Sequence, residues 1–193
     1  MTYSDTISAI ATARGRAALA VVRLSGPEAV SIAAGCFSGK ELLSADSHTA
    51  HVGYLVGSDG VEIDQVVVTV FRSPRSVTGE DVVEISCHGG DFASQLILRR
   101  LLEAGARMAH PGEFTQRAFI NGKMDLAQAE AVADLIHSSS SLAHRVSVSH
   151  LQGRYSEVLN ELRSELLELC AFIELELDFS EEDVEFADRN ALQ

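Results

Sequence analysis

The 193-residue sequence predicts an α+β domain, a mixed sheet with helices, followed by an all-α segment of the helical-bundle kind. Two observations predict this class. Over the first two-thirds, short β-rich runs alternate with helix-like segments, and one hairpin lies among them. From Leu126 to about Leu177 there is no proline, and apolar residues recur with the 3.6-residue period of a helix. We therefore expect a sheet domain over residues 1–120 and part of a helical domain over residues 121–193.

The first predicted elements are a strand, a helix and a hairpin. Residues 18–24 form a short apolar run that suits a buried strand. Pro27 follows, and we expect it to be the first residue of a helix that continues through Ile32. Asp59-Gly60 separates two β-rich runs, residues 49–56 and 61–71, and this dipeptide is typical of a hairpin turn.

A further strand and helix complete the sheet domain. Residues 81–87 predict a strand that ends in His88-Gly89-Gly90. Residues 92–104 predict an amphipathic helix, which Gly105 ends in the C′ position. Strands interleaved with helices favour a mixed sheet with helices packed on it.

The second segment begins at Asp125, which we expect to be the N-cap of its first helix. Serines at residues 138–141 predict a break after that helix. Beyond them, apolar residues recur at steps of three and four from Leu151 to Leu177, which predicts one continuous helix. An apolar stripe must pack on something, and an antiparallel bundle is the usual arrangement. The stripe still runs at Leu177, so we expect a chain cut before the rest of its bundle.

Charge and composition exclude several classes of protein. The net charge is −13, and eight acidic residues between Glu174 and Asp188 leave the remainder at only −5. An acidic chain on its own binds nucleic acid poorly, because affinity for the phosphate backbone comes largely from Lys and Arg. Three widely spaced cysteines indicate reduced thiols. No apolar run reaches the ~20 residues of a membrane helix, and no secretory signal is readable, so we expect a cytoplasmic protein without a membrane span.

Three charged residues are candidates for a binding site. Glu84 lies in a strand otherwise made of Val, Val and Ile, where a carboxylate costs free energy unless it is paired or faces a ligand. It could accept N–H bonds from a planar heterocycle such as a pterin, or simply face water. Arg23 interrupts an apolar strand and needs a carboxylate or phosphate partner. Lys123, between a turn and a helix cap, could meet an anion or be merely solvated.

Other chemistries are weakly signalled. Cys87 and His88 are adjacent on a strand and so point to opposite faces, which argues against a nucleophile–base pair. No histidine spacing suits a metal site. Neither Gly39-Lys40 nor Gly122-Lys123 is followed by Ser or Thr, so the sequence has no Walker A motif for GTP. We expect no catalytic residue and no metal ligand in this chain.

Five segments carry a family resemblance. They are Asp5-Thr6-Ile7 with Ala11-Thr12 and Gly15-Arg16; Val22-Arg23-Leu24-Ser25-Gly26; Thr78-Gly79-Glu80-Asp81-Val82-Val83-Glu84 with His88-Gly89-Gly90; Pro111-Gly112-Glu113-Phe114 with Arg117-Ala118-Phe119; and Lys123 with Asp125-Leu126-Ala127-Gln128-Ala129-Glu130-Ala131. Together, and in this order, they resemble the MnmE (TrmE) family of tRNA-modification GTPases.

The resemblance implies a fold and a set of ligands. Family members begin with a domain similar to the tetrahydrofolate-binding domain of aminomethyltransferases, which forms a homodimer. Carried over by motif, the folate contacts fall on Arg23, Glu84 and Lys123, for 5-formyl- or 5,10-methylene-tetrahydrofolate. A helical domain follows, interrupted by a GTPase domain that binds GTP, Mg²⁺ and K⁺. We expect this GTPase domain to be missing here, so that the chain does not hydrolyse GTP.

The implied activity belongs to the full-length protein. With the FAD protein MnmG (GidA), in a heterotetramer, it adds a carboxymethylaminomethyl or aminomethyl group to C5 of the wobble uridine in tRNA. Two alternatives remain open on the sequence. The chain could be a non-catalytic dimerisation scaffold for the GTPase domains, or a free-standing folate-dependent aminomethyltransferase.

Overall fold

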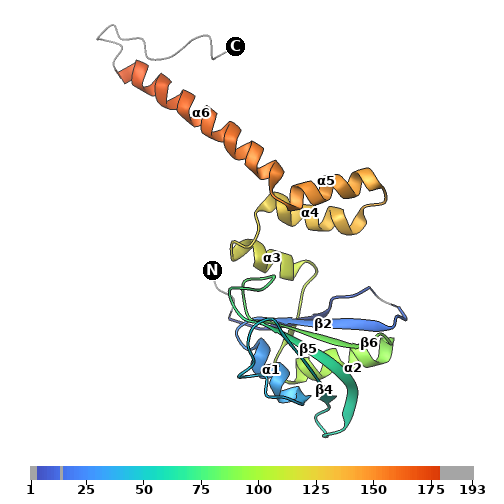
Figure 1. Ribbon diagram of the computed structural model, residues 1–193. Coiled ribbons are helices and arrows are strands. Elements are labelled where there is room, and N and C mark those ends of the chain that lie inside the picture. Colours follow the sequence, from blue (N-terminus) through green and yellow to red (C-terminus); the bar gives the residue numbers. More distant parts are fainter. Residues whose placement is uncertain (1–3, 14, 179–193) are drawn as a thin grey trace. The chain divides into compact units, whose positions relative to one another are not determined.

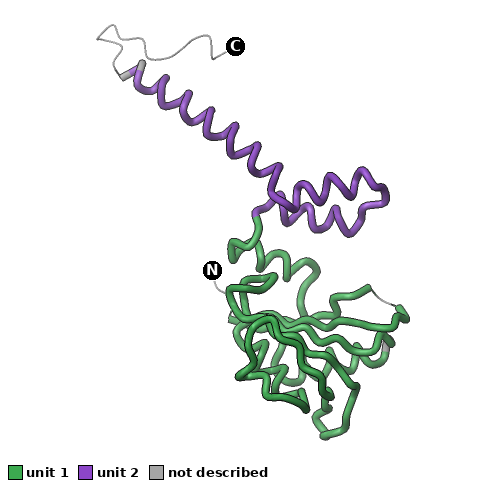
Figure 2. Tube along the Cα trace, viewed as in Figure 1, with its two compact units in different colours: residues 1–124 green, residues 125–193 purple. Residues whose placement is uncertain are grey.

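The structure is a computed structural model that describes residues 4–13 and 15–178. The described residues fall into two compact units, which divide between Met124 and Asp125 (Figure 2). The first unit holds all the strands of the described chain and three helices, and the second holds three helices. The expectation of an α+β domain followed by an all-α segment is confirmed.

The first unit is built on a seven-stranded sheet with the order β3-β4-β5-β6-β2-β1-β7. All neighbouring strands are antiparallel except β1 and β7, which are parallel. The strands are β1 (Ile7–Ile10), β2 (Leu19–Ser25), β3 (Phe37–Ser38), β4 (Thr49–Val56), β5 (Glu62–Phe71), β6 (Val82–His88) and β7 (Arg107–Met108).

One face of the sheet carries the hydrophobic core. Helices α1 (Ala29–Cys36) and α2 (Asp91–Glu103) pack there, and α3 (Glu113–Ile120) lies on the opposite side of the sheet (Figure 1). Side chains alternate between the two faces of a strand, so every second residue of β2, β5 and β6 enters the core. The core residues from these strands and from α2 include Val22, Leu24, Val66, Val68, Val83, Ile85, Ile97 and Leu101.

The predicted hairpin and the predicted end of the amphipathic helix are confirmed. β4 and β5 pair on either side of Asp59-Gly60. After α2, the N–H of Gly105 donates to Leu102 O and the N–H of Ala106 donates to Leu101 O, which is a Schellman motif.

The prediction for Pro27 was wrong in its detail, because α1 begins at Ala29 with Glu28 as its N-cap. The chain is tied to β1 before the helix starts. The N–H of Glu28 donates to Thr6 Oγ1 at 2.9 Å, and Gly26 lies directly against the backbone of Asp5 and Thr6. These contacts hold Pro27 in the connection between strand and helix.

The second unit consists of α4 (Leu126–His137), α5 (Ser141–Leu151) and α6 (Arg154–Asp178). Helices α4 and α5 form a hairpin (Figure 1). Asp125 caps α4 as predicted, in a capping box with Gln128, and Ser140 caps α5 after the predicted break. The side-chain amide of Gln128 also donates to Leu151 O at 2.9 Å, which ties the start of α4 to the end of α5.

The prediction of a single helix from Leu151 to Leu177 was wrong. Leu151 ends α5, and α6 begins only at Arg154. Between them Gly153 has a φ of 82°, a left-handed conformation that a continuous helix does not allow. The apolar period runs through this turn, so the period alone could not reveal it.

Most of the predicted acidic stretch lies outside the described residues. No helix within residues 4–13 and 15–178 has the length and hydropathy to cross a membrane.

Two glycine substitutions test the packing between β1 and the start of α1. A Cβ at Gly26 would lie 2.6 Å from Asp5 O at a φ of 139°, so we expect Gly26→Ala to lower the unfolding free energy by about 2 kcal/mol or more. A Cβ at Gly35, inside α1, meets nothing within 4 Å, so Gly35→Ala should raise the unfolding free energy by about 0.5–1 kcal/mol. Urea denaturation followed by circular dichroism measures both, and equal effects would contradict this account.

Candidate functional site

Arg23 and Glu84 form an ion pair on the sheet face opposite α1 and α2. The two residues lie directly across from each other on β2 and β6. Arg23 Nε and NH2 both donate to Glu84 Oε1, at 2.9 and 2.6 Å. The side chains are 26% and 28% exposed, so the pair is partly buried but open to solvent. The structure therefore brings together two of the three residues predicted for the site.

An aromatic ring from α3 adjoins this pair. The guanidinium carbon of Arg23 lies 5.5 Å from the centroid of the Phe114 ring, within the range of a cation–π interaction. The sequence analysis did not single out Phe114 as a site residue. Its only signal was its place in the Pro-Gly-Glu-Phe motif, because nothing in the sequence shows that α3 crosses over β2.

Lys123 lies apart from the pair. Its Nζ donates to Pro74 O at 3.1 Å, and its stem packs beside Gly79, in the loop that precedes β6. Within the described part of the chain, no hydrogen bond or ion pair joins Lys123 to Arg23 or Glu84. The Lys123 side chain is exposed.

An ion network centred on the buried side chain of Arg117 lies beside the site. The side chain of Arg117 on α3 is fully buried, and its NH2 donates to Asp5 Oδ1 at 2.8 Å and to Glu113 Oε1 at 3.1 Å. Its NH1 donates to the carbonyl of Asp5 at 2.9 Å and to the carboxylate of Glu80 at 3.3 Å. Arg107 donates to Asp5 at 2.7 Å and to Glu113 at 2.5 Å. The network thus joins α3, β7, the start of β1 and the loop before β6.

The network also reaches the strand that carries Arg23. Ser25, on β2, donates to Glu80 Oε2 at 2.7 Å and lies 2.6 Å from Thr78 Oγ1. Ser25 and Arg23 are two residues apart on one strand, so they share a sheet face. Sequence reasoning missed this network as a unit, although its members stand in the segments that carry the family resemblance.

The arginines determine the ionisation of the neighbouring acids. The hydrogen bond from Arg107 lowers the pKa of Glu113 to about 2, against the opposing effect of burial. Burial would raise the pKa of Asp5, but hydrogen bonds from Arg107 and Arg117 outweigh it, and this pKa lies below its ordinary value. Burial likewise disfavours the charge on Arg117, but the surrounding carboxylates raise its pKa overall. Asp5, Glu113 and Arg117 are therefore ionised at neutral pH.

Cys87 and His88 do not form a nucleophile–base pair. Burial raises the pKa of the Cys87 thiol to about 11, which keeps it protonated and unreactive. His88 is exposed, and its Nδ1 lies 2.6 Å from Asp64 Oδ1, at the end of β6. Among the described residues, no group of three or more His, Cys, Asp or Glu side chains is placed to hold a metal ion.

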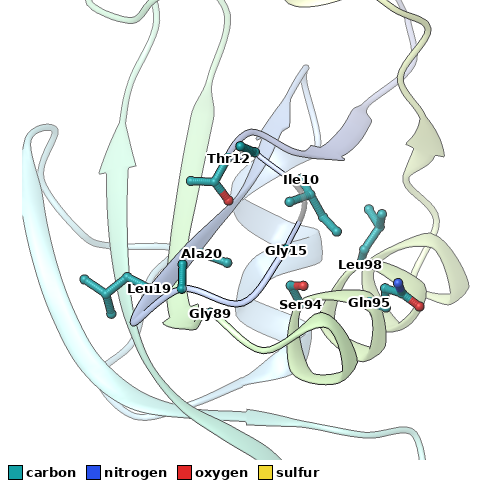
Figure 3. A pocket seen from close by; sticks show the side chains of 11 residues that line it. Ile10, Thr12, Gly15, Leu19, Ala20, Gly89, Ser94, Gln95 and Leu98 are labelled. Atoms are coloured by element: carbon teal, nitrogen blue, oxygen red, sulfur yellow. The ribbon is translucent and has the colours of Figure 1, made fainter.

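A separate cavity of about 490 Å³ lies between the β1–β2 connection and α2 (Figure 3). Ile10, Leu19 and Leu98 supply apolar walls. Thr12 Oγ1 accepts from the Val21 N–H, and Ser94 Oγ donates to Gly90 O. The polar side chains of its lining are those of Thr12, Ser94 and Gln95.

Comparisons with known proteins cover nearly the whole chain. Residues 6–123 match the family described as GTP-binding protein TrmE N-terminus, and residues 126–193 match the MnmE helical domain. A tRNA modification GTPase MnmE of Salinibacter ruber is 67% identical over 193 residues, which are all of this chain and 42% of the relative. Proteins of the same name from Cytophaga hutchinsonii and Bacteroides thetaiotaomicron are 52% and 54% identical, over 99% and 98% of this chain. The chain spans 41% of the length of each of these two.

The pKa of Glu113 predicts how stability depends on pH. The value is about 2 in the folded chain against an ordinary 4.5, so folding favours the ionised carboxylate. The stabilisation is fully present above pH 4.5, and we expect the unfolding free energy to fall as the pH drops from there towards 2. Glu113→Gln should be less stable at neutral pH and should show a shallower decline in acid. Glu103→Gln, which changes an exposed surface pair, is the control. Urea titrations across this pH range that give equal slopes for all three proteins would refute the assignment.

Proposed function

Because this chain belongs to the MnmE (TrmE) family of tRNA-modification GTPases, we propose that it forms the part of such an enzyme that binds a tetrahydrofolate one-carbon donor and dimerises. The Arg23–Glu84 pair carries this proposal. It is a partly exposed ion pair on the sheet face opposite α1 and α2, with an aromatic ring beside it.

The residues at this face fit the pterin end of a folate. A pterin is a flat ring with hydrogen-bonding groups along one edge, which a carboxylate and a guanidinium can bind in the plane of the ring. Ala9 and Thr69 lie across from Arg23 and Glu84 on the neighbouring strands, and both have small side chains. We assign the pterin to Arg23 and Glu84, and a carboxylate of the folate tail to Lys123. The one-carbon unit, as 5-formyl- or 5,10-methylene-tetrahydrofolate, is what this ligand would supply.

The remaining steps are assigned to the full-length enzyme. We infer that a homodimer of this kind acts with MnmG (GidA) to add a carboxymethylaminomethyl or aminomethyl group to C5 of the wobble uridine of tRNA, in the cytoplasm. The sequence has no Walker A motif. Binding and hydrolysis of GTP, with Mg²⁺ and K⁺, are therefore assigned to the part of the relatives' length that this chain does not match.

Calorimetric titration with 5-formyl-tetrahydrofolate tests the proposal. We expect saturable binding by a dimer, with the mass measured by light scattering. Replacing the Glu84 carboxylate removes charge-assisted hydrogen bonds, so Glu84→Gln should weaken binding by about 1.5–3 kcal/mol. The control Glu103→Gln, on the surface of α2, should bind like the unaltered chain. A folded dimer that binds no folate would instead favour the dimerisation scaffold, and transfer of a one-carbon unit by this chain alone would favour a free-standing aminomethyltransferase.

A further inference from the structure

The loop that leads into β6 lies beside two cations without anionic partners. Residues 72–81 form this loop between β5 and β6. Arg75 lies on the loop and Lys123 follows α3, and both side chains are exposed. Lys123 Nζ donates to Pro74 O at 3.1 Å, and this carbonyl belongs to the peptide bond between Pro74 and Arg75. Within residues 4–13 and 15–178, neither cation forms an ion pair, and the Arg75 side chain makes no hydrogen bond.

The acidic residues of this region are already engaged by other groups. Arg117 NH1 donates to Glu80 Oε2 at 3.3 Å. Arg72 NH1 donates to Asp81 Oδ2 at 3.2 Å. The Asp125 carboxylate caps α4. These acids therefore do not balance the charge of the two cations, although the chain as a whole has a net charge of −13.

Hydrogen bonds hold the backbone of the loop in place. Ser73 Oγ donates to Gly79 O at 2.9 Å, and Asn121 Nδ2 donates to Thr78 O at 2.8 Å. The Lys123 stem packs on the loop, because a Cβ added at Gly79 would lie 3.2 Å from Lys123 Cγ. Two positive groups held at one loop repel each other, and an anion bound by both offsets that repulsion. The loop therefore favours the binding of an anion beside it.

We propose that Arg75 and Lys123 together bind the poly-γ-glutamyl tail of a folate, so that this chain prefers polyglutamylated folates to the monoglutamate. The inference rests on the proposed function, which assigns one carboxylate of the folate tail to Lys123. Each further γ-linked glutamate adds a carboxylate beyond the first, and Arg75 is the cation attached to the peptide that Lys123 contacts. A nucleic-acid backbone is usually bound by many Lys and Arg side chains, so two cations on an acidic chain suit a short anionic tail better.

Calorimetric titration with 5-formyl-tetrahydrofolate, as the monoglutamate and as the triglutamate, tests the inference at low ionic strength. Exposed charge pairs are individually weak, so we expect the triglutamate to bind about three- to tenfold more tightly. The preference should shrink as salt is added, because salt screens exposed charges. Equal affinities, or tighter binding of the monoglutamate, would overturn the inference and leave the proposed function standing. If neither compound binds, the proposed function fails and the inference fails with it.

Arg75→Gln isolates the new residue. The fold uses the backbone N–H of Arg75, which donates to Arg72 O, and glutamine keeps that group. We expect the preference for the triglutamate to fall to about twofold or less, with the affinity for the monoglutamate changed by less than about twofold. An unchanged preference would overturn the role of Arg75.

Arg16→Gln is the matched control, because it removes the same charge from another exposed arginine. Arg16 lies beside the other end of β6, where the Ala17 N–H donates to Gly89 O. This variant should keep the preference of the unaltered chain. An equal loss of preference in both variants would show an effect of net charge alone and would overturn the inference. Binding of an RNA oligonucleotide that Arg75→Gln abolishes, without any preference for the triglutamate, would instead assign the two cations to phosphates.

Discussion

The fully buried guanidinium of Arg117 constrains the first unit more than any other polar group described. Removing a guanidinium from water is costly unless its hydrogen bonds are replaced. Here Asp5, Glu80 and Glu113 provide that replacement, and Arg107 shares two of the three carboxylates. Deleting a buried partner such as Glu113 typically costs about 3–5 kcal/mol, because the charge of Arg117 stays buried. The acids therefore have to reach Arg117 from three different parts of the chain.

This constraint positions the candidate site. The network fixes α3 against the sheet, so that Phe114 lies over the guanidinium of Arg23. It also reaches β2 through the hydrogen bond from Ser25 to Glu80, two residues from Arg23 on the same face. The binding groups are thus supported by packing and by hydrogen bonds that a ligand does not supply. Such preorganisation lowers the free energy spent on ordering side chains when a ligand binds.

Local patterns were enough to predict most elements, but not the contacts between distant segments. The hairpin at Asp59-Gly60 and the cap at Asp125 followed from the dipeptide and the residue type. Arg23 and Glu84 stood out separately as charges in apolar strands, but only the pairing of β2 with β6 shows that they lie opposite each other. Arg117 gave no signal of burial, since Asp5 is 112 residues away in sequence. The turn at Gly153 was hidden because the apolar period continues through it.

Burial separates two uses of the same kinds of side chain in this unit. Arg117 and Glu113 are almost fully enclosed, so their ionisation is tied to folding, as the depressed pKa of Glu113 shows. The Arg23–Glu84 pair is about a quarter exposed, so water and a ligand can reach it. A charged pair that a ligand can reach is suited to binding, whereas the enclosed pair of Arg117 and Glu113 is suited to holding the fold together. Substitutions at Arg23 or Glu84 should therefore affect ligand affinity far more than the stability of the fold. Substitutions at Arg117 should affect the stability of the fold more than ligand affinity.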